Sequence, residues 1–212
     1  MTESKGETGC GCHGDTNRAA VDPAYRRALW IVVILNAGFG IIELFGGFLA
    51  NSQALKADSL DFLGDGSITF IGLLALAWSA STRAKVALTQ GLFLALLGVW
   101  VLGMAAWRAM NAVPPEAELM GGIGIAALAV NVTAAIVLAR FRDSGDAQAR
   151  AIWLFSRNDA INNVAVIIAA GLVSWLQSAW PDLVVAAIIA VVFLHSAWEI
   201  IRDARRELAE RR

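Results

Sequence analysis

Three aspartates in the stretch KADSLDFLGDGS, residues 56–67, are spaced so that they could act on one ligand together. They are Asp58, Asp61 and Asp65, and they lead into the apolar segment ITFIGLLALAW. Because a helix turns by about 100° per residue, residues three and seven positions apart fall on one face. Carboxylates gathered on one face offer hard oxygen ligands to a divalent cation. What this face does depends on whether water or lipid surrounds the helix.

The composition indicates that the surroundings are lipid. Hydrophobic residues make up 58% of the 212 residues and charged residues only 17%, whereas globular domains carry about 45–50% apolar and about 25% charged residues. Apolar runs of about 20 residues match a bilayer core of about 30 Å, because a helix rises about 1.5 Å per residue. The net charge of −1 gives no sign of a nucleic-acid partner. The chain is therefore predicted to be an integral membrane protein that contacts the lipid bilayer.

An all-α fold with six transmembrane helices is predicted from the apolar runs. The predicted spans cover approximately residues 28–50, 52–79, 86–107, 120–138, 151–176 and 181–201. The connections between them contain polar residues, glycine or proline. We expect an N-terminal tail at 1–23, a transmembrane domain at 24–207 and a short C-terminal tail at 208–212.

Lysine and arginine residues predict the orientation of the chain. They cluster before the first span, after the second, after the fourth and after the sixth, while the opposite connections have only Lys56 and Arg108 nearby. Positive residues favour the cytoplasmic side of a membrane. Both termini are therefore predicted to be cytoplasmic, which an even number of spans allows, and the predicted location is a bacterial inner (plasma) membrane.

Further ionisable and amide side chains lie within the predicted spans. Such groups are costly in lipid and usually mark a pathway or a paired site. They are Glu43, Arg157, Asp159, His195, Asn36, Asn131, Asn158, Asn162 and Asn163. No Lys or Arg at a matching depth is available to pair Asp61 and Asp65, which argues against a purely structural role for these two.

Asp61, Asp65 and Asp159 could together bind a divalent cation. Without metal, three adjacent carboxylates cannot all stay ionised in a medium of low dielectric constant, so at least one should bind a proton. Metal and protons then compete for one site, which is the thermodynamic basis of an antiporter. Asp61 and Asp65 also lie near the middle of their span, where alternating-access carriers hold their substrate.

Four other polar residues have more than one interpretation. Asp58 could face water or cap its helix, and Arg157 could extend its side chain to the cytoplasmic interface. His195, alone on an apolar helix, is a packing residue or a ligand. Glu43 could pair with an Asn or Ser of a neighbouring helix or serve as a proton-binding group.

The segment NAGFGIIELFGGFLANSQALKADSLDFLGD resembles the first two spans of the cation diffusion facilitators, the six-helix divalent-metal/proton antiporters. The second-span motif of that family, ADxLDxLxD, is matched by ADSLDFLGD at residues 57–65. FSRNDAINNVAVIIAAGLV and WPDLVVAAIIAVVFLHSAWEII resemble its fifth and sixth spans, so the resemblance covers about residues 24–207. It implies that Asp61, Asp65 and Asp159 are metal ligands, and we expect Asn162 or Asn163 to assist. It also implies a homodimer.

Two features depart from the family pattern. Many members have His-xxx-Asp or Asp-xxx-Asp in the fifth span, whereas here Phe155 stands four residues before Asp159. Phenylalanine cannot coordinate a metal, and a site made of oxygen ligands weakens a default assumption of zinc. The candidates for a fourth ligand are water, a first-span group and the amides Asn158, Asn162 and Asn163. Many members also carry a cytoplasmic ferredoxin-like domain after the last helix, which we expect this sequence, ending at Arg212, to lack.

The N-terminal segment CGCHGD contains three soft potential ligands, Cys10, Cys12 and His13. Such ligands suit zinc, cadmium or copper, and a cytoplasmic location would keep the thiols reduced. Three ligands are too few to close a tetrahedral site. A metal-capture site and a polar tail without a metal therefore both stay open as interpretations.

The predicted function is export of a divalent transition metal, of the Zn, Cd, Co, Fe or Mn class, from the cytoplasm in exchange for protons. The metal is the transported substrate, and no prosthetic group is expected. The alternative is a non-transporting membrane partner or metal-dependent scaffold derived from the same family. No enzyme is predicted, because the sequence has no nucleophile–base arrangement, phosphate loop or redox motif.

Overall fold

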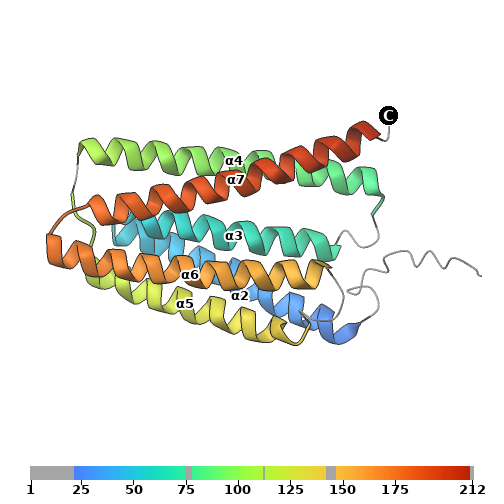
Figure 1. Ribbon diagram of the computed structural model, residues 1–212, viewed down its shortest axis with the longest axis horizontal. Coiled ribbons are helices and arrows are strands. Elements are labelled where there is room, and N and C mark those ends of the chain that lie inside the picture. Colours follow the sequence, from blue (N-terminus) through green and yellow to red (C-terminus); the bar gives the residue numbers. More distant parts are fainter. Residues whose placement is uncertain (1–21, 75–77, 112, 142–146, 211–212) are drawn as a thin grey trace, which may run out of the picture.

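The computed structural model describes residues 22–74, 78–111, 113–141 and 147–210, and its regular structure in these ranges is entirely helical. The helices are α2 (Pro23–Leu49), α3 (Gln53–Leu74), α4 (Ala80–Met110), α5 (Ala117–Ala139), α6 (Ala147–Leu176) and α7 (Trp180–Glu210), shown in Figure 1. The predicted all-α fold is confirmed. Cys10, Cys12 and His13 lie outside the described residues, as does the side chain of Phe155.

Five of these helices are long and apolar enough to cross a membrane: Pro23–Leu49, Ala84–Met110, Ala117–Ala139, Ser156–Leu176 and Trp180–Ala209. Large apolar side chains such as Ile34, Leu96 and Trp175 are exposed on their outer faces, where lipid would cover them. The protein is therefore an integral membrane protein. The remaining helix, α3, is less apolar because Lys56 and the three aspartates interrupt it.

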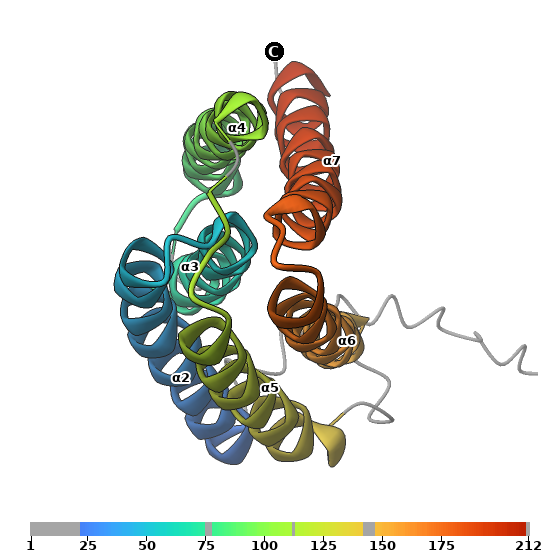
Figure 2. The ribbon, with the colours of Figure 1, turned by 90° about the vertical axis from the view of Figure 1, so that its left-hand side faces the viewer.

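The helices associate mainly in three pairs. The most extensive contacts join α2 with α3, α5 with α6, and α4 with α7. Seen along the bundle in Figure 2, α4 and α7 lie side by side, with α2 and α5 at the opposite edge. The helices α3 and α6 contact each other little, so the two helices that carry the predicted ligands are not packed against each other along their length.

Glycines allow α2 and α3 to approach closely. A Cβ atom added to Gly66 would lie 3.0 Å from the backbone nitrogen of Ala37, and one added to Gly47 would lie 3.1 Å from the backbone nitrogen of Lys56. Close contacts between helix backbones in membranes depend on such small residues. The contact between Gly66 and Ala37 sets the register of the two helices. Asn36 precedes Ala37 and Asp65 precedes Gly66 in the sequence, so this register also sets the positions of Asn36 and Asp65 along the bundle.

One end of the bundle is tied together by a buried aspartate. Asp182, in the first turn of α7, is only 1% exposed. Its carboxylate accepts hydrogen bonds from Ser52 Oγ (2.5 Å), Gln53 N (2.8 Å) and Ala54 N (2.9 Å). The first N–H groups of a helix have no partner within that helix. A side chain of α7 therefore caps the N-terminus of α3.

A buried arginine strengthens the same end. Arg108, near the C-terminus of α4, donates to the backbone oxygen of Asn51 at 2.6 Å and to that of Val113 at 2.8 Å. It also donates to the Asn51 side chain. These bonds join the end of α4 to the connection between α2 and α3. The helices α4 and α7 are thus both linked to the start of α3.

Candidate functional site

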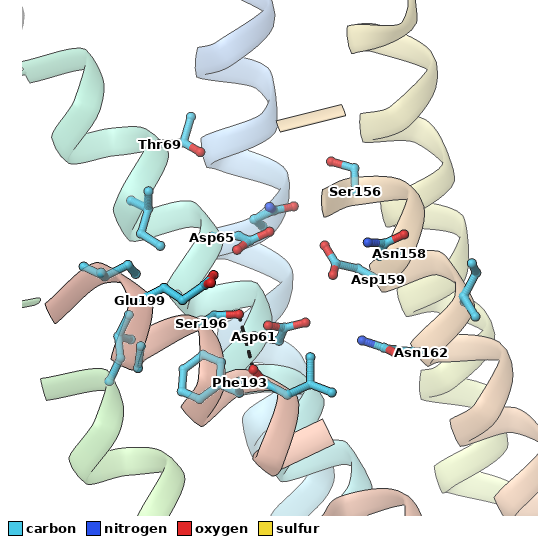
Figure 3. Close-up of a pocket in the computed structure, with 18 of the residues that line it drawn as sticks. Asp61, Asp65, Thr69, Ser156, Asn158, Asp159, Asn162, Phe193, Ser196 and Glu199 are labelled. Atoms are coloured by element: carbon cyan, nitrogen blue, oxygen red, sulfur yellow. Dashed lines mark hydrogen bonds between the residues drawn. The ribbon is translucent and has the colours of Figure 1, made fainter. Parts of the chain in front are cut away.

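A cavity of about 740 Å³ lies between α3, α6 and α7. Asp61 and Asp65 reach it from α3, and Asp159 reaches it from α6, as Figure 3 shows. Asp159 interacts electrostatically with both of the other carboxylates. The structure therefore brings the three predicted ligands to one cavity.

Asp159 stands across the cavity from Asp61 and Asp65 (Figure 3). Within the described parts of the chain, no group of three or more Asp, Glu, His or Cys side chains is arranged so that it could hold a metal ion. Asp159 nevertheless interacts with the carboxyl groups of both Asp61 and Asp65. The three side chains are therefore close enough to influence one another, although α3 and α6 contact each other little.

Asparagines contribute the rest of the polar lining near the carboxylates. Asn162 points its amide nitrogen toward Asp61 in Figure 3 and interacts with it. Asn158 accepts a hydrogen bond from Arg157 at 3.3 Å. Asn36 lines the cavity from α2. Two of the three fifth-span amides predicted as ligand candidates, Asn158 and Asn162, therefore lie at the cavity.

The third of those amides, Asn163, is not among the cavity-lining residues. It donates to Asp58 Oδ2 at 2.5 Å and accepts from Asn131 Nδ2 at 2.9 Å, and all three side chains are buried. This chain of hydrogen bonds links α3, α6 and α5. The interpretation of Asp58 as a water-facing residue is wrong, because Asp58 is only 1% exposed.

Glu43 lies beside Asp58 in the same buried region, where the two carboxyl groups interact. Glu43 is fully buried, and neither of its carboxylate oxygens has a hydrogen-bond partner within the described residues. The predicted pairing of Glu43 with an Asn or Ser is therefore not formed. Its neighbour is a second acid instead.

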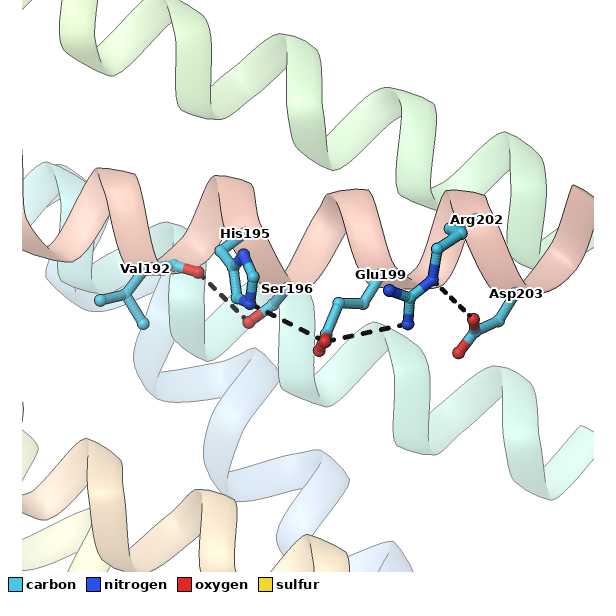
Figure 4. A network of polar contacts seen from close by, with 6 residues as sticks. All are labelled: Val192, His195, Ser196, Glu199, Arg202 and Asp203. Atoms are coloured by element: carbon cyan, nitrogen blue, oxygen red, sulfur yellow. Dashed lines mark hydrogen bonds and ion pairs between the residues drawn. The ribbon is translucent and has the colours of Figure 1, made fainter.

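His195 does not line the cavity, and 72% of its side chain is exposed. Its Nε2 atom lies 3.8 Å from Glu199 Oε1, and the same oxygen lies 4.0 Å from Arg202 Nη2. Figure 4 shows these three side chains along α7. The structure gives His195 no place among the ligands of the cavity.

Sequence analysis missed two groups of polar residues. Ser196, Glu199 and Asp203 line the cavity from α7, and their spacing of three and four residues on one helical face was the available signal. Asp182 follows a Trp-Pro pair at the start of its helix, which is an N-terminal signature. Its partners on α3 could not be read from that signature, because they lie about 130 residues away in the sequence.

The cavity is asymmetric along the bundle. On α3 its lining begins at Asp61 and continues to Thr69, and on α6 it runs from Ser156 to Asn162. On α7 it runs from Val192 to Asp203. All three stretches extend toward the end of the bundle where α3 ends and α6 begins. The opposite half is closed by the hydrogen bonds of Asp58, Asp182 and Arg108.

Comparisons with known proteins identify the family to which these apolar helices belong. Residues 29–209 match the cation efflux transmembrane domain family. The zinc transporter ZitB of Escherichia coli (strain K12) is 26% identical over 210 residues, which cover 93% of this chain and 67% of the relative. A cadmium, cobalt and zinc/H(+)-K(+) antiporter of Bacillus velezensis is 28% identical over 200 residues, covering 87% of this chain and 63% of the relative.

A third relative is the metal cation efflux system protein CzcD of Cupriavidus metallidurans, 25% identical over 199 residues, which cover 87% of this chain and 62% of the relative. The chain thus spans about two thirds of the length of these relatives. The family match extends over nearly all of the membrane region, including every helix that lines the cavity. The chain belongs to the cation efflux family, the cation diffusion facilitators.

Proposed function

We propose that this protein exports a divalent transition metal ion from the cytoplasm in exchange for protons. The observation that carries the proposal is the meeting of Asp61, Asp65 and Asp159 at one cavity inside an apolar bundle. Ionisable residues at such a depth are costly and usually belong to a transport pathway. The relatives named as a zinc transporter and as a cadmium, cobalt and zinc antiporter support metal efflux.

The proposed topology has six membrane spans with both termini in the cytoplasm. The 22 residues of α3 suffice for a bilayer core of about 30 Å at about 1.5 Å per residue, and the neighbouring helices shield its charges from lipid. Arginines such as Arg140 and Arg202 gather at the end of the bundle toward which the cavity extends. Because positive residues favour the cytoplasm, the cavity in this conformation leads to the cytoplasmic side.

The proposed coupling follows from the charge of the site. Three carboxylates in a bundle of low dielectric constant bind protons when no cation neutralises them. A divalent ion that binds there displaces protons, and protons that return displace the ion. Closure of the cytoplasmic half and opening of the opposite half would then release the ion on the other side of the membrane.

Metal binding by the purified protein is expected to release protons. Isothermal titration calorimetry with Mn²⁺, Zn²⁺ and Cd²⁺ in two buffers of different ionisation enthalpy should give heats that differ between the buffers. The apparent affinity for metal should fall by about tenfold for each unit by which the pH is lowered, per proton that the metal displaces. Metal binding with the same affinity at pH 6 and pH 8 would contradict proton–metal competition.

A further inference from the structure

The polar residues on one face of α2 have the same spacing as those on α3. Asn36 and Glu43 are seven residues apart on α2, and Asp65 and Asp58 are seven residues apart on α3. Glu43 lies beside Asp58, which is in the closed half. Asn36 is two helical turns away toward the cavity. One face of α2 thus contributes a side chain to each half of the bundle.

Backbone contact between α2 and α3 sets the level at which Asn36 and Asp65, which both line the cavity, lie along the bundle. Ala37, the neighbour of Asn36, packs against Gly66, the neighbour of Asp65, so closely that a Cβ atom on Gly66 would lie 3.0 Å from the Ala37 nitrogen. The helices cannot separate at this level without losing that contact. Asn36 and Asp65 therefore line the cavity from two adjacent helices that are closely packed at this level.

The side-chain oxygen of Asn36 has no hydrogen-bond partner within the described residues, although Asn36 is only 2% exposed. The large majority of buried side-chain polar atoms are paired in proteins, and an exception needs an explanation such as a water or ion that completes the pairing. The amide of Gln53 is also unpaired, but it does not line the cavity. Asn158 and Asn163 differ from Asn36 in this respect. The oxygen of Asn158 accepts from Arg157, and the oxygen of Asn163 accepts from Asn131.

From these observations we infer that Asn36 of α2 supplies an amide oxygen to the transported ion, beside Asp61, Asp65 and Asp159. This inference rests on the proposed function. It places a ligand on the first span, in a chain whose fifth span has the non-coordinating Phe155 four residues before Asp159. An amide oxygen is a hard, neutral ligand, so it favours ions such as Mn²⁺ over the softer Cd²⁺ without adding charge to the site.

The test is calorimetric titration of the purified full chain with Mn²⁺ and with Cd²⁺, comparing the wild type with Asn36→Leu and Asn36→Cys. Asn36→Leu should weaken Mn²⁺ binding by about 10–100-fold. Asn36→Cys should raise the ratio of Cd²⁺ to Mn²⁺ affinity, because a thiolate is a soft ligand. A purely structural role for Asn36 would not change that ratio. Size-exclusion profiles and thermal midpoints establish that each variant is folded.

Asn111→Leu is the control, because it removes an exposed asparagine amide at the C-terminus of α4 that does not line the cavity. Its metal affinities should stay near those of the wild type. Wild-type affinities in folded Asn36 variants, or a loss in Asn111→Leu as large as that in Asn36→Leu, would overturn the inference while leaving the proposed function intact. Absence of metal binding in the wild type itself would instead refute the proposed function.

Discussion

Replacement of Asp159 by asparagine is expected to reduce metal affinity by at least about 100-fold, because loss of an outer-sphere partner alone costs about 10–100-fold. Asp159 is the one carboxylate that α6 contributes to the cavity, opposite Asp61 and Asp65. The Asp159→Asn variant keeps the size of the side chain and one oxygen. It loses the charge that would draw α6 toward an ion held on α3. Calorimetric titration with Mn²⁺, Zn²⁺ and Cd²⁺ measures the loss.

Asp203→Asn is the control for this experiment. Asp203 lines the far end of the cavity, but its side chain is largely exposed and pairs with Arg202. Because exposed charges are screened by solvent and salt, its replacement should change metal affinity by no more than about threefold. If the Asp159→Asn protein bound every metal as the wild type does, α6 would not be part of the site.

The second large effect is expected at the closed end of the bundle. Asp182→Ala removes three hydrogen-bond contacts at once and leaves the N–H groups of Gln53 and Ala54 without their acceptor, so that only the bond from Leu55 N to Ser52 Oγ still caps α3. Hydrogen bonds to a charged group contribute about 1.5–3 kcal/mol each, so a loss of about 3 kcal/mol or more is expected. At about 2–4 °C per kcal/mol for a chain of this size, the thermal midpoint should fall by roughly 6–12 °C.

The thermal midpoint of Asp182→Asn should lie between those of the wild type and Asp182→Ala, because asparagine keeps one acceptor oxygen. Glu118→Ala is the matched control, since Glu118 is also an acid in the first turn of a helix but is exposed. Its substitution should change the midpoint little. Thermal unfolding in detergent, followed by size-exclusion chromatography, checks this order. Equal midpoints for Asp182→Ala and Glu118→Ala would mean that the contact between α7 and α3 does not stabilise the closed end.

The helices could be predicted from the sequence because each contains a long apolar run, and their approximate positions follow from those runs. Helix α3 was the hardest case for hydropathy, because Lys56 and three aspartates interrupt its apolar run and it is not among the five helices apolar enough to span a membrane. Those same charges made it the most informative segment for function. The meeting of Asp61, Asp65 and Asp159 was a possibility on the residues alone and was implied by the resemblance, because the spacing along the chain does not by itself place α6 opposite α3.

The direction of Asn163 could not be predicted from its spacing. Residues four apart share a helical face only approximately, with an offset of about 40° and a rise of about 6 Å. From Asp159 to Asn163 this shift is enough to pass from the cavity to the closed half, where Asn163 meets Asp58 and Asn131. The burial of Asp58 escaped prediction for a related reason, since its partner is 105 positions away in the sequence.

The central claim is that the three aspartates couple metal movement to proton movement. The most direct test is uptake of Mn²⁺, Zn²⁺ or Cd²⁺ into proteoliposomes that contain the full chain, under an imposed pH gradient. We expect metal to enter with simultaneous movement of protons in the opposite direction, at a rate that rises with the gradient. Asp65→Asn should abolish both fluxes. Movement of no metal, or movement that ignores both the pH gradient and Asp65→Asn, would contradict the account.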